Sequence, residues 1–300
     1  MAGTLHIDTG REMRGGQWQV FYLLEGMTKA GHDCTLLSRP GSPLLERARA
    51  AGIDARPLRL PELIRIAPSH ELVHAHDARA HTLASFLGRP VVVSRRVAFP
   101  VGRSPSSRWK YARASRYIAV SNYVRNILIA AGISDDKIDV VYDGVPLPPE
   151  PRLDSRSRIV AIDSSDPGKG RLLIENAARR AHLEVVFSKN LPADLTEAAL
   201  FVYVTESEGL GSAALLAMGA GVPVLASAVG GLPEVVEDGV TGLLMPENSS
   251  DRIASAMLEM LRDRTRLAQF GRNARERAER AFTTEHMLRN TLSVYEKVLA

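Results

Sequence analysis

The chain has 300 residues, 45% of them hydrophobic and 24% charged, with a formal net charge of +4. This composition excludes a disordered chain and a collagen-like repeat, and a single cysteine, Cys34, excludes a disulfide scaffold. No apolar run approaches the roughly 18–20 residues of a membrane span. No basic segment followed by an apolar one opens the chain, so we expect a cytoplasmic protein of one large or two ordinary domains.

The basic residues gather in one stretch of the chain. No Asp or Glu occurs between Ala78 and Ser134. The basic residues there are Arg79, Arg89, Arg95, Arg96, Arg103, Arg108, Lys110, Arg113, Arg116 and Arg125. Positive potential at this stretch would attract phosphates or anionic lipid. An ordinary solvated basic face explains the run equally well, and nucleic acid is not an expected partner because no recognised binding module is present.

Strands and helices alternate along the first half of the chain. Short apolar runs predict strands, and apolar residues at helical spacing predict helices. The predicted strands are 5–7, 34–37, 56–60, 72–74, 90–93, 117–120 and 139–142. The predicted helices are 15–30, 43–51, 78–87 and 123–131. Ser121 precedes the last of these helices as its predicted N-cap.

Residues 144–157 contain four prolines and are the best candidate for a linker. Beyond them the alternation restarts. The predicted strands are 158–162, 184–187, 200–204 and 223–226, with helices 170–181 and 211–220 and a tail from residue 250 that is helical in three pieces. We therefore predict two parallel-sheet α/β domains, 1–147 and 148–300, and expect the last helix, about 283–300, to pack back on the first domain. A cleft between the domains is the expected ligand site.

Several chemistries lack their motifs. No G-x-G-x-x-G follows the first strand, and residues 166–170 lack both the first glycine and the final hydroxyl of a nucleotide-binding P-loop. Neither H-E-x-x-H, nor a cysteine pair, nor G-x-S-x-G occurs, so zinc and a hydrolase triad are not predicted. No Asp-x-Asp pair occurs, which disfavours a carboxylate-held metal on a nucleotide-sugar.

Residues 206–246 are the most informative part of the chain because glycines punctuate them throughout. Residues 208–211 form a predicted loop that leads from a strand into a helix. A helix N-terminus offers unpaired N–H groups and a partial positive charge, which suit a phosphate or a sugar hydroxyl. Gly230 and Gly231 form a second predicted loop at which backbones approach closely.

This segment resembles the donor-binding signature of the family-4 retaining glycosyltransferases. The matching motifs are S-E-G-L-G at 207–211, A-M-G-A-G-V-P-V at 217–224, G-G-L-P-E at 230–234 and G-V-T-G at 239–242. Further matches are G-G at 15–16, V-H-A-H-D at 73–77, A-V-S at 119–121, Y-D-G-V at 142–145 and P-G-K-G at 167–170. The resemblance spans roughly residues 5 to 280. It implies a GT-B-like fold, in which two Rossmann-like parallel-sheet domains face a cleft, here with a reduced second domain.

The resemblance also implies roles for individual residues. Lys169 would neutralise the donor diphosphate, Glu208 would accept a hydrogen bond from the donor sugar, and His76 would lie near both, so these three form the expected catalytic set. The expected donor-binding residues are Gly15, Gly16, Ser164, Gly209, Leu210, Gly211, Leu216, Gly230 and Gly231. Arg95 and Arg96 end a predicted strand on the acceptor side, where alternation lets only one of them face an acidic acceptor. No metal site is expected.

Three features depart from the family pattern. Leu216 stands where the family has the glutamate that binds the donor ribose, and Ser164 stands where it has an arginine for the diphosphate. Only 22 residues separate Ala177 from Leu200, where the family usually fits a further strand and helix.

The leading hypothesis is a retaining, metal-independent hexosyltransferase that uses a UDP- or GDP-type sugar as substrate, needs no cofactor and acts on a glycan or lipid-linked acceptor. Cell-envelope polysaccharide synthesis is its expected setting. Two alternatives stay open, a glycosyltransferase-like binding protein that has lost donor binding, and an enzyme with a lipid-phosphate sugar donor. Phe99, Trp109 and Tyr111 interleave with the basic stretch, which allows a peripheral contact with an anionic membrane at its inner face.

Overall fold

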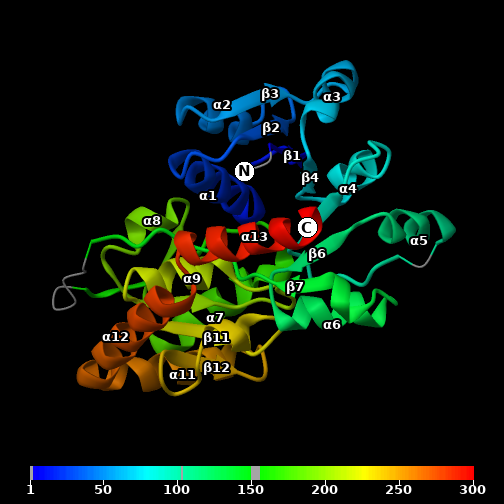
Figure 1. The fold of residues 1–300 in the computed structure, drawn as a ribbon. Coiled ribbons are helices and arrows are strands. Elements are labelled where there is room, and N and C mark those ends of the chain that lie inside the picture. The colour runs from blue at the N-terminus through cyan, green and yellow to red at the C-terminus, as the bar shows by residue number, and fades with distance from the viewer. Residues whose placement is uncertain (1–2, 103, 150–155) are drawn as a thin grey trace. The chain divides into compact units, whose positions relative to one another are not determined.

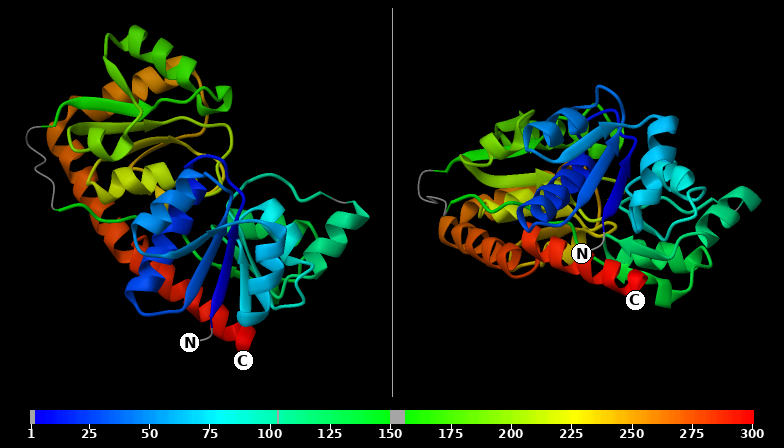
Figure 2. Two further views of the ribbon diagram at one scale, coloured as in Figure 1. Left: turned by 90° about the horizontal axis from the view of Figure 1, so that it is seen from above. Right: turned by 45° about the horizontal axis from the view of Figure 1, so that its top comes forward.

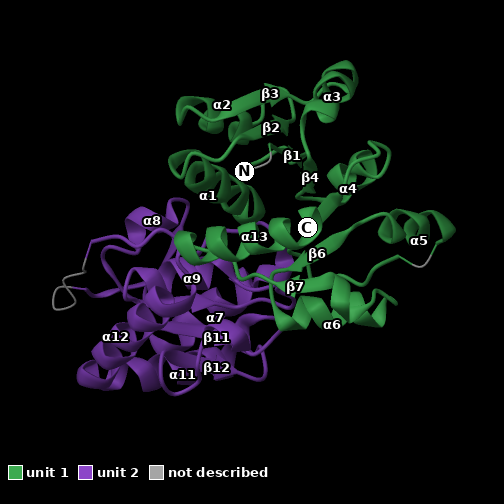
Figure 3. Ribbon diagram, in the orientation of Figure 1, with its two compact units in different colours: residues 1–144, 284–300 green, residues 145–283 purple. Residues whose placement is uncertain are grey.

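The computed structural model describes residues 3–102, 104–149 and 156–300 (Figure 1). The chain divides into two compact units, shown in Figure 3. Unit 1 comprises residues 1–144 and 284–300, and unit 2 comprises residues 145–283. Each unit is built on its own parallel sheet, which confirms the predicted α/β class with two Rossmann-like halves. Residues 150–155 of the predicted linker, and Arg103 of the basic stretch, lie outside the described residues.

The sheet of unit 1 has seven strands in the order β3-β2-β1-β4-β5-β6-β7, all paired in parallel. The strands are β1 (Thr4–Asp8), β2 (Cys34–Ser38), β3 (Asp54–Pro57), β4 (Leu72–Ala75), β5 (Val91–Arg95), β6 (Arg116–Ala119) and β7 (Ile138–Val140). The chain runs from β1 outward in one direction and then, from β4, in the other. The strand order therefore reverses between β1 and β4, which is where open parallel sheets bind ligands.

The helices of unit 1 are α1 (Gly15–Lys29), α2 (Pro43–Ala50), α3 (Leu60–Ile66), α4 (Ala78–Ala84), α5 (Pro105–Ala112), α6 (Asn122–Ala130) and α13 (Thr284–Leu299), with 3-10 turns η1 (Ala67–Ser69) and η2 (Asp135–Lys137). Helix α13 lies beside α1 in Figures 1 and 2. Both helices contribute to one core, through Leu24 and Met27 of α1 and Met287 and Val294 of α13. The lone cysteine, Cys34, is buried in this core with a free thiol.

Two helices of unit 1 escaped prediction, and one predicted strand is wrong at its end. β3 stops at Pro57, and Leu60, which was predicted to end that strand, begins α3. Helix α3 has only seven residues, of which Leu63 and Ile66 are buried, whereas Leu60 and Ile64 are 63% and 61% exposed. Helix α5 has no buried residue, and a helix without a buried apolar stripe gives no periodic signal.

Unit 2 has a sheet of five parallel strands in the order β12-β11-β10-β8-β9. The strands are β8 (Arg158–Ile162), β9 (Val185–Ser188), β10 (Ala198–Tyr203), β11 (Val224–Ser227) and β12 (Gly242–Met245). The helices are α7 (Arg171–Ala181), α8 (Leu191–Asp194), α9 (Ser212–Gly219), α10 (Leu232–Val235), α11 (Ser250–Arg262) and α12 (Arg264–Ala281), with a 3-10 turn η3 (Pro167–Lys169). The order reverses at β8, between β9 and β10, and the helical tail falls into three helices as predicted. No helix in the described part of the chain is long and apolar enough to cross a bilayer.

Candidate functional site

Lys169 and Glu208 meet at the carboxyl ends of β8 and β10. The Lys169 Nζ lies 2.8 Å from Glu208 Oε2 and 3.3 Å from the Tyr203 hydroxyl. The Tyr203 hydroxyl donates a short hydrogen bond to the same Glu208 oxygen. The side chains of Lys169 and Glu208 are 28% and 17% exposed, so solvent or a ligand can reach both. Two of the three predicted catalytic residues therefore lie together at the sheet edge that binds ligands in this class of fold.

The local backbone explains why this cluster forms. The Asp166 side chain accepts a hydrogen bond of 3.0 Å from the Gly168 N–H and closes the η3 turn that presents Lys169. Gly170 follows at φ +64, where a Cβ would lie 2.5 Å from Val204 Cγ1. Only glycine lets this turn lie against the end of β10.

Tyr203 acts as a hydrogen-bond donor in this cluster. Burial, together with the charge of Glu208 and its hydrogen bond, raises the pKa of Tyr203 well above 10. The phenol therefore stays protonated at neutral pH and its one proton goes to Glu208. Sequence analysis missed Tyr203, because a tyrosine in a buried strand is usually a core residue.

The loop that carries Glu208 is shaped by the predicted pair Gly230 and Gly231. A Cβ on Gly230 would lie 1.9 Å from the Glu208 carbonyl oxygen, and a Cβ on Gly231 would lie 2.2 Å from the Gly209 carbonyl oxygen. The Gly231 N–H also donates to the Glu208 carbonyl oxygen at 3.1 Å. The close approach predicted for this pair is thus an approach of two backbones, which holds Glu208 in place. Leu210 is buried, and Gly211 at φ +112 leads into α9 without a side-chain cap.

The two positions that depart from the family pattern have ordinary local roles. The Ser164 hydroxyl accepts a hydrogen bond of 3.2 Å from the Asp166 N–H. Leu216 lies half-buried on α9. Neither side chain is charged, so neither supplies the charge that the family has at this position for the donor nucleotide.

His76, the third predicted catalytic residue, lies in unit 1 just beyond β4. It is 7% exposed, and its Nε2 lies 3.0 Å from the Nδ1 of His6 on β1. His74, two residues earlier on β4, is completely buried. One ring nitrogen from each of His6, His74 and His76 lies within 4.8 Å of the other two. Burial lowers the pKa of His6 to about 3 and holds the pKa values of His74 and His76 well below 6.5, so all three rings are neutral at pH 7.

Arg95 and Arg96 turn to different partners, as alternation at a strand end requires. Arg95 donates to the Tyr111 hydroxyl at 2.9 Å and to the Phe99 carbonyl oxygen. Arg96 forms an ion pair of 3.0 Å with Asp143, and the two side chains are only 14% and 6% exposed.

The N-terminus of α1 lies next to Arg96. A Cβ on Gly16 would lie 3.9 Å from Arg96 Cδ. Helix α1 begins at Gly15 without a side-chain cap and without an acidic residue in its first turn. This end of α1 therefore keeps free N–H donors and a partial positive charge.

Other polar residues of unit 1 were missed by sequence analysis. Asp8 on β1 is completely buried, accepts hydrogen bonds from the Gly10 N–H and Gln17 Nε2, and has a pKa raised by burial and by Asp77. The available signal was an alternation of polar residues within buried strands, with His6 and Asp8 on β1 and His74 and His76 at β4. Residues two apart on a strand share a face, so this pattern marks one polar sheet face.

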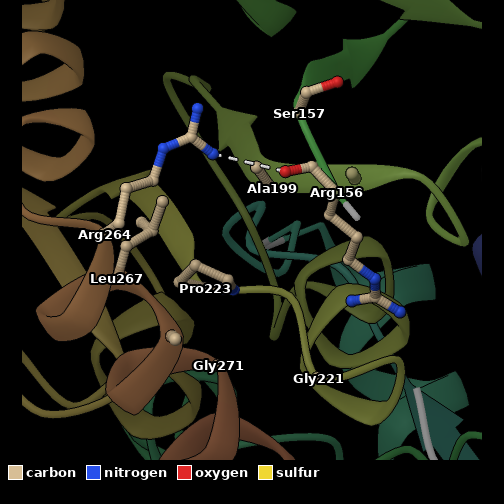
Figure 4. Close-up of a pocket in the computed structure, with 10 residues that line it drawn as sticks. Arg156, Ser157, Ala199, Gly221, Pro223, Arg264, Leu267 and Gly271 are labelled. Carbon is tan, nitrogen blue, oxygen red and sulfur yellow. Dashed lines mark hydrogen bonds between the residues drawn. The ribbon is translucent and has the colours of Figure 1, made fainter. Parts of the chain in front are cut away.

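A pocket of about 500 Å³ lies at the amino ends of β8, β10 and β11, the opposite edge of the unit 2 sheet from Lys169 (Figure 4). Arg264 donates to the Arg156 carbonyl oxygen at 3.3 Å across this pocket, while the Arg156 guanidinium donates to the Ala220 carbonyl oxygen at 2.9 Å. These bonds connect the start of β8 to α12 and to the end of α9. Because it lies at the opposite edge of the sheet, the pocket is separate from the Lys169 and Glu208 cluster.

Two family descriptions match the chain. The one for glycosyl transferases group 1 matches residues 151–277, and the one for glycosyltransferase family 4 matches residues 13–147. The chain is 39% identical over 112 residues to alpha-maltose-1-phosphate synthase of Mycolicibacterium smegmatis, covering 35% of this chain and 29% of that protein. It is 37% identical over 147 residues to D-inositol 3-phosphate glycosyltransferase of Kribbella flavida, covering 46% and 34%. The matches thus span about a third of these curated relatives.

Solved structures match over nearly the whole chain. Anabaena HepE, crystallised with UDP-glucose, has a TM-score of 0.84 at 17% identity and covers 99% of this chain and 100% of its own. Sucrose-phosphate synthase of Thermosynechococcus elongatus has a TM-score of 0.71 at 17% identity and covers 98% of both chains. These likenesses show the fold. With both family descriptions matched along its length, the chain belongs to the family-4 glycosyltransferases of GT-B fold.

Proposed function

We propose that this chain is a retaining, metal-independent glycosyltransferase that moves a hexosyl group from a UDP- or GDP-type sugar to a glycan or lipid-linked acceptor. The cluster of Lys169, Glu208 and Tyr203 carries the proposal, because it sets a reachable ammonium beside a held carboxylate at the ligand-binding edge of the sheet. The names of the relatives above, which are a synthase of a sugar phosphate and a glycosyltransferase, support it.

The proposed chemistry needs charge stabilisation and positioning. Lys169 balances the charge that develops on the departing diphosphate, for which a compact ammonium is well suited. Glu208, held by the Tyr203 hydroxyl, accepts a hydrogen bond from a hydroxyl of the donor sugar. The acceptor oxygen arrives on the face from which the diphosphate leaves, so no protein nucleophile is required. We infer metal independence from the sequence, which has no Asp-x-Asp pair, and from the cation that Lys169 provides instead.

A binding screen followed by a transfer assay tests this function. We expect one of UDP, GDP, ADP and their common sugars to raise the melting temperature, since a ligand at 100 times its Kd adds about 2.7 kcal/mol to stability. The matching sugar should then be transferred in the presence of EDTA, with NMR showing a retained anomeric configuration in the product. Inversion, a requirement for metal, or the absence of both binding and transfer would each contradict a part of the proposal.

A second function is favoured by Leu216 and Ser164. An apolar residue and a turn-forming serine stand where the family places a ribose-binding carboxylate and a diphosphate-binding arginine. These residues suit a protein that has lost nucleotide binding, or an enzyme whose donor is a lipid-phosphate sugar. The variant Leu216→Glu discriminates the cases. A large gain in nucleotide affinity would show an otherwise intact donor site, whereas no affinity before or after the change would favour the second function.

The acceptor side carries a surface suited to an anionic membrane, and we extend the proposal to a peripheral contact there. The rings of Phe86 and Trp109 lie 5.0 Å apart, and the Arg113 guanidinium lies 4.9 Å from the Trp109 ring. Phe86 and Phe99 are 70% and 65% exposed. Exposed aromatic rings among basic residues favour a lipid headgroup region. Sedimentation with anionic vesicles, lost in Phe86→Ser and weak with neutral vesicles, is the expected result. Equal binding to both vesicle types would contradict it.

A further inference from the structure

The three histidines of unit 1 have the spacing of a metal site, but His74 is already saturated. Its Nδ1 lies 2.6 Å from the Tyr295 hydroxyl and its Nε2 lies 2.8 Å from the Ser94 hydroxyl. A neutral imidazole has one N–H and one lone pair, and two hydroxyl groups satisfy both. His74 therefore has no nitrogen left for a metal or a ligand without breaking one of these bonds. The remaining two histidines, His6 and His76, form a chain of hydrogen bonds with Thr4.

The direction of this chain follows from Thr4. The Thr4 hydroxyl lies 3.4 Å from the Asp33 carbonyl oxygen, which can only accept, and 3.1 Å from His6 Nε2, which donates or accepts according to its tautomer. We assign the single Thr4 proton to the carbonyl oxygen, so that the hydroxyl oxygen accepts from a protonated His6 Nε2. A neutral His6 with a protonated Nε2 has a bare Nδ1. That Nδ1, 3.0 Å from His76 Nε2, can only accept, so His76 carries its proton on Nε2.

The consequence is a bare nitrogen on His76. With its proton on Nε2, His76 presents a lone pair at Nδ1. This atom is buried, and it has no hydrogen-bond partner within the described residues. His76 stands at the carboxyl end of β4, beside the point between β1 and β4 where the strand order reverses. A buried acceptor without a partner is costly unless a ligand supplies the donor.

We propose that Thr4 and His6 are positioning residues that fix the tautomer of His76, so that its Nδ1 accepts a hydrogen bond from a substrate hydroxyl. The inference rests on the proposed function only in naming a sugar hydroxyl as the donor. The hydroxyl belongs either to the sugar of the nucleotide-sugar or to the acceptor. Because the lone pair cannot donate, a substrate whose hydroxyl is replaced by fluorine or a methyl ether loses this contact.

The tautomer can be measured in the free protein, independently of any activity. Long-range 1H–15N NMR spectra of protein labelled with 15N-histidine separate protonated from bare ring nitrogens, and His76→Gln assigns the His76 signals by their loss. We expect His76 with Nε2 protonated and Nδ1 bare. A protonated Nδ1 overturns the proposal. A change of the three histidine spectra on adding Zn²⁺ also overturns it, because it would replace the hydrogen-bond chain with a metal site.

Variants of His6 and Thr4 test the direction of the chain. His6→Leu removes the acceptor of the His76 proton and should abolish the preference for one tautomer. His6→Gln should restore it, because the amide oxygen replaces Nδ1 as acceptor and the amide NH₂ replaces the Nε2 proton toward Thr4. If His6→Leu fails to fold, Thr4→Val, which removes only the hydroxyl, should still shift proton occupancy toward His76 Nδ1. The control His81→Gln, at a buried histidine bonded to the Lys110 carbonyl oxygen, should leave the His76 signals unchanged. If neither His6→Leu nor Thr4→Val changes the His76 signals, Thr4 and His6 do not position the His76 proton.

Transfer kinetics and titrations separate the two sources of the hydroxyl. If the chain transfers sugars, His6→Leu should lower kcat/KM by about tenfold, the upper range for one hydrogen bond, and His6→Gln should recover most of it. Titration with the nucleotide-sugar that passes the binding screen should move the His76 Nδ1 resonance if the donor sugar supplies the hydroxyl. Movement only when the acceptor is added assigns it to the acceptor. If a mixture of protein, nucleotide-sugar and acceptor leaves the His76 Nδ1 resonance unmoved, the proposed contact is overturned. Absence of any transfer overturns the proposed function but does not affect the tautomer measurement.

Discussion

The two places where strand order reverses are built in opposite ways. In unit 1 buried polar side chains gather where the strand order reverses and bond to one another, as His6 does to His76, His74 to Ser94 and Arg96 to Asp143. In unit 2 the edge at β8 and β10 is shaped by backbones in contact at Gly170, Gly230 and Gly231, with one partly exposed ion pair above them. The first construction ties function to stability, whereas the second allows the two to be changed separately.

The largest effect should come from breaking the buried ion pair of unit 1. Asp143→Asn removes the carboxylate that forms the ion pair with the buried Arg96 guanidinium, and we expect it to lower the free energy of unfolding by about 3 kcal/mol. Trp18 and Trp109 are the only tryptophans and both lie in unit 1, so tryptophan fluorescence during urea unfolding reports on this unit. The double variant Arg96→Met with Asp143→Leu should recover part of the loss. A loss below about 1 kcal/mol would mean that this ion pair contributes no more stability than an exposed one, and the contrast between the units would disappear.

The stability of unit 1 should also depend more strongly on acid than the stability of unit 2. The pKa of His81, lowered to about 4 by burial above all, lies below the value of about 6.5 in an unfolded chain. As the pH falls, His81 is protonated in the unfolded state before it is protonated in the folded state. Its contribution to the free energy of unfolding is therefore present above pH 6.5 and is lost as the pH falls toward 4. His81 alone should cost about 2 kcal/mol between pH 6.5 and 5.

His81→Gln should flatten the pH dependence of the unit 1 unfolding transition by this amount, whatever its effect at pH 7. Unit 2 holds a single histidine, His182, which is exposed, and should respond less to acid in this range. Hydrogen exchange at pH 7 and pH 5 measures both units in one sample. Equal slopes for the variant and the parent protein would contradict the assignment.

A third change sharpens the comparison from the side of unit 2. Lys169→Ala should lower turnover by at least about tenfold, which corresponds to about 1.4 kcal/mol of charge stabilisation. Its melting temperature should change little, because the side chain is 28% exposed and only one ion pair is lost. Lys189→Ala is the matched control, since this lysine follows β9 at the same edge and its side chain is 87% exposed. Unchanged turnover in Lys169→Ala would refute the role of Lys169.

The smallest effect should come from Tyr203→Phe. The variant keeps the ring stacked against Phe201, at 5.8 Å between centroids, and removes only the hydroxyl that holds Glu208. Losing one hydrogen bond of about 1 kcal/mol should lower kcat/KM about fivefold. Steady-state kinetics measures this, and a loss as large as that of Lys169→Ala would mean that Tyr203 touches the substrate itself.

The contrast between the units also explains what could be predicted from sequence. The Glu208 loop was predictable because backbone contacts demand glycines at fixed spacing, and such spacing is visible in one segment of chain. The fold class was predictable because buried parallel strands are apolar runs. Strand β12 was missed because Gly242 opens it, where a Cβ would lie 1.9 Å from the Val224 carbonyl oxygen, and its glycine resembles a loop signal.

The polar face of unit 1 was not predictable in the same way. His6 and His76 are 70 positions apart, and His74 and Tyr295 are 221 apart. Nothing local in the sequence announces such a pair, and a buried histidine in a strand has an ordinary structural explanation. The partners become evident only when the register of β1 and β4 sets His6 opposite His74.

The assignment of α13 to unit 1 has a consequence for vectorial synthesis. Residues 145–283 form unit 2 as one continuous segment, whereas unit 1 is made of two segments and is complete only when residues 284–300 have been added. A nascent chain that has emerged as far as Thr283 already contains all of unit 2, but its older portion still lacks Met287, Val294 and Tyr295 from the core. The half that is translated first should thus be the half that matures last, and His74 should be without its phenolic partner until then.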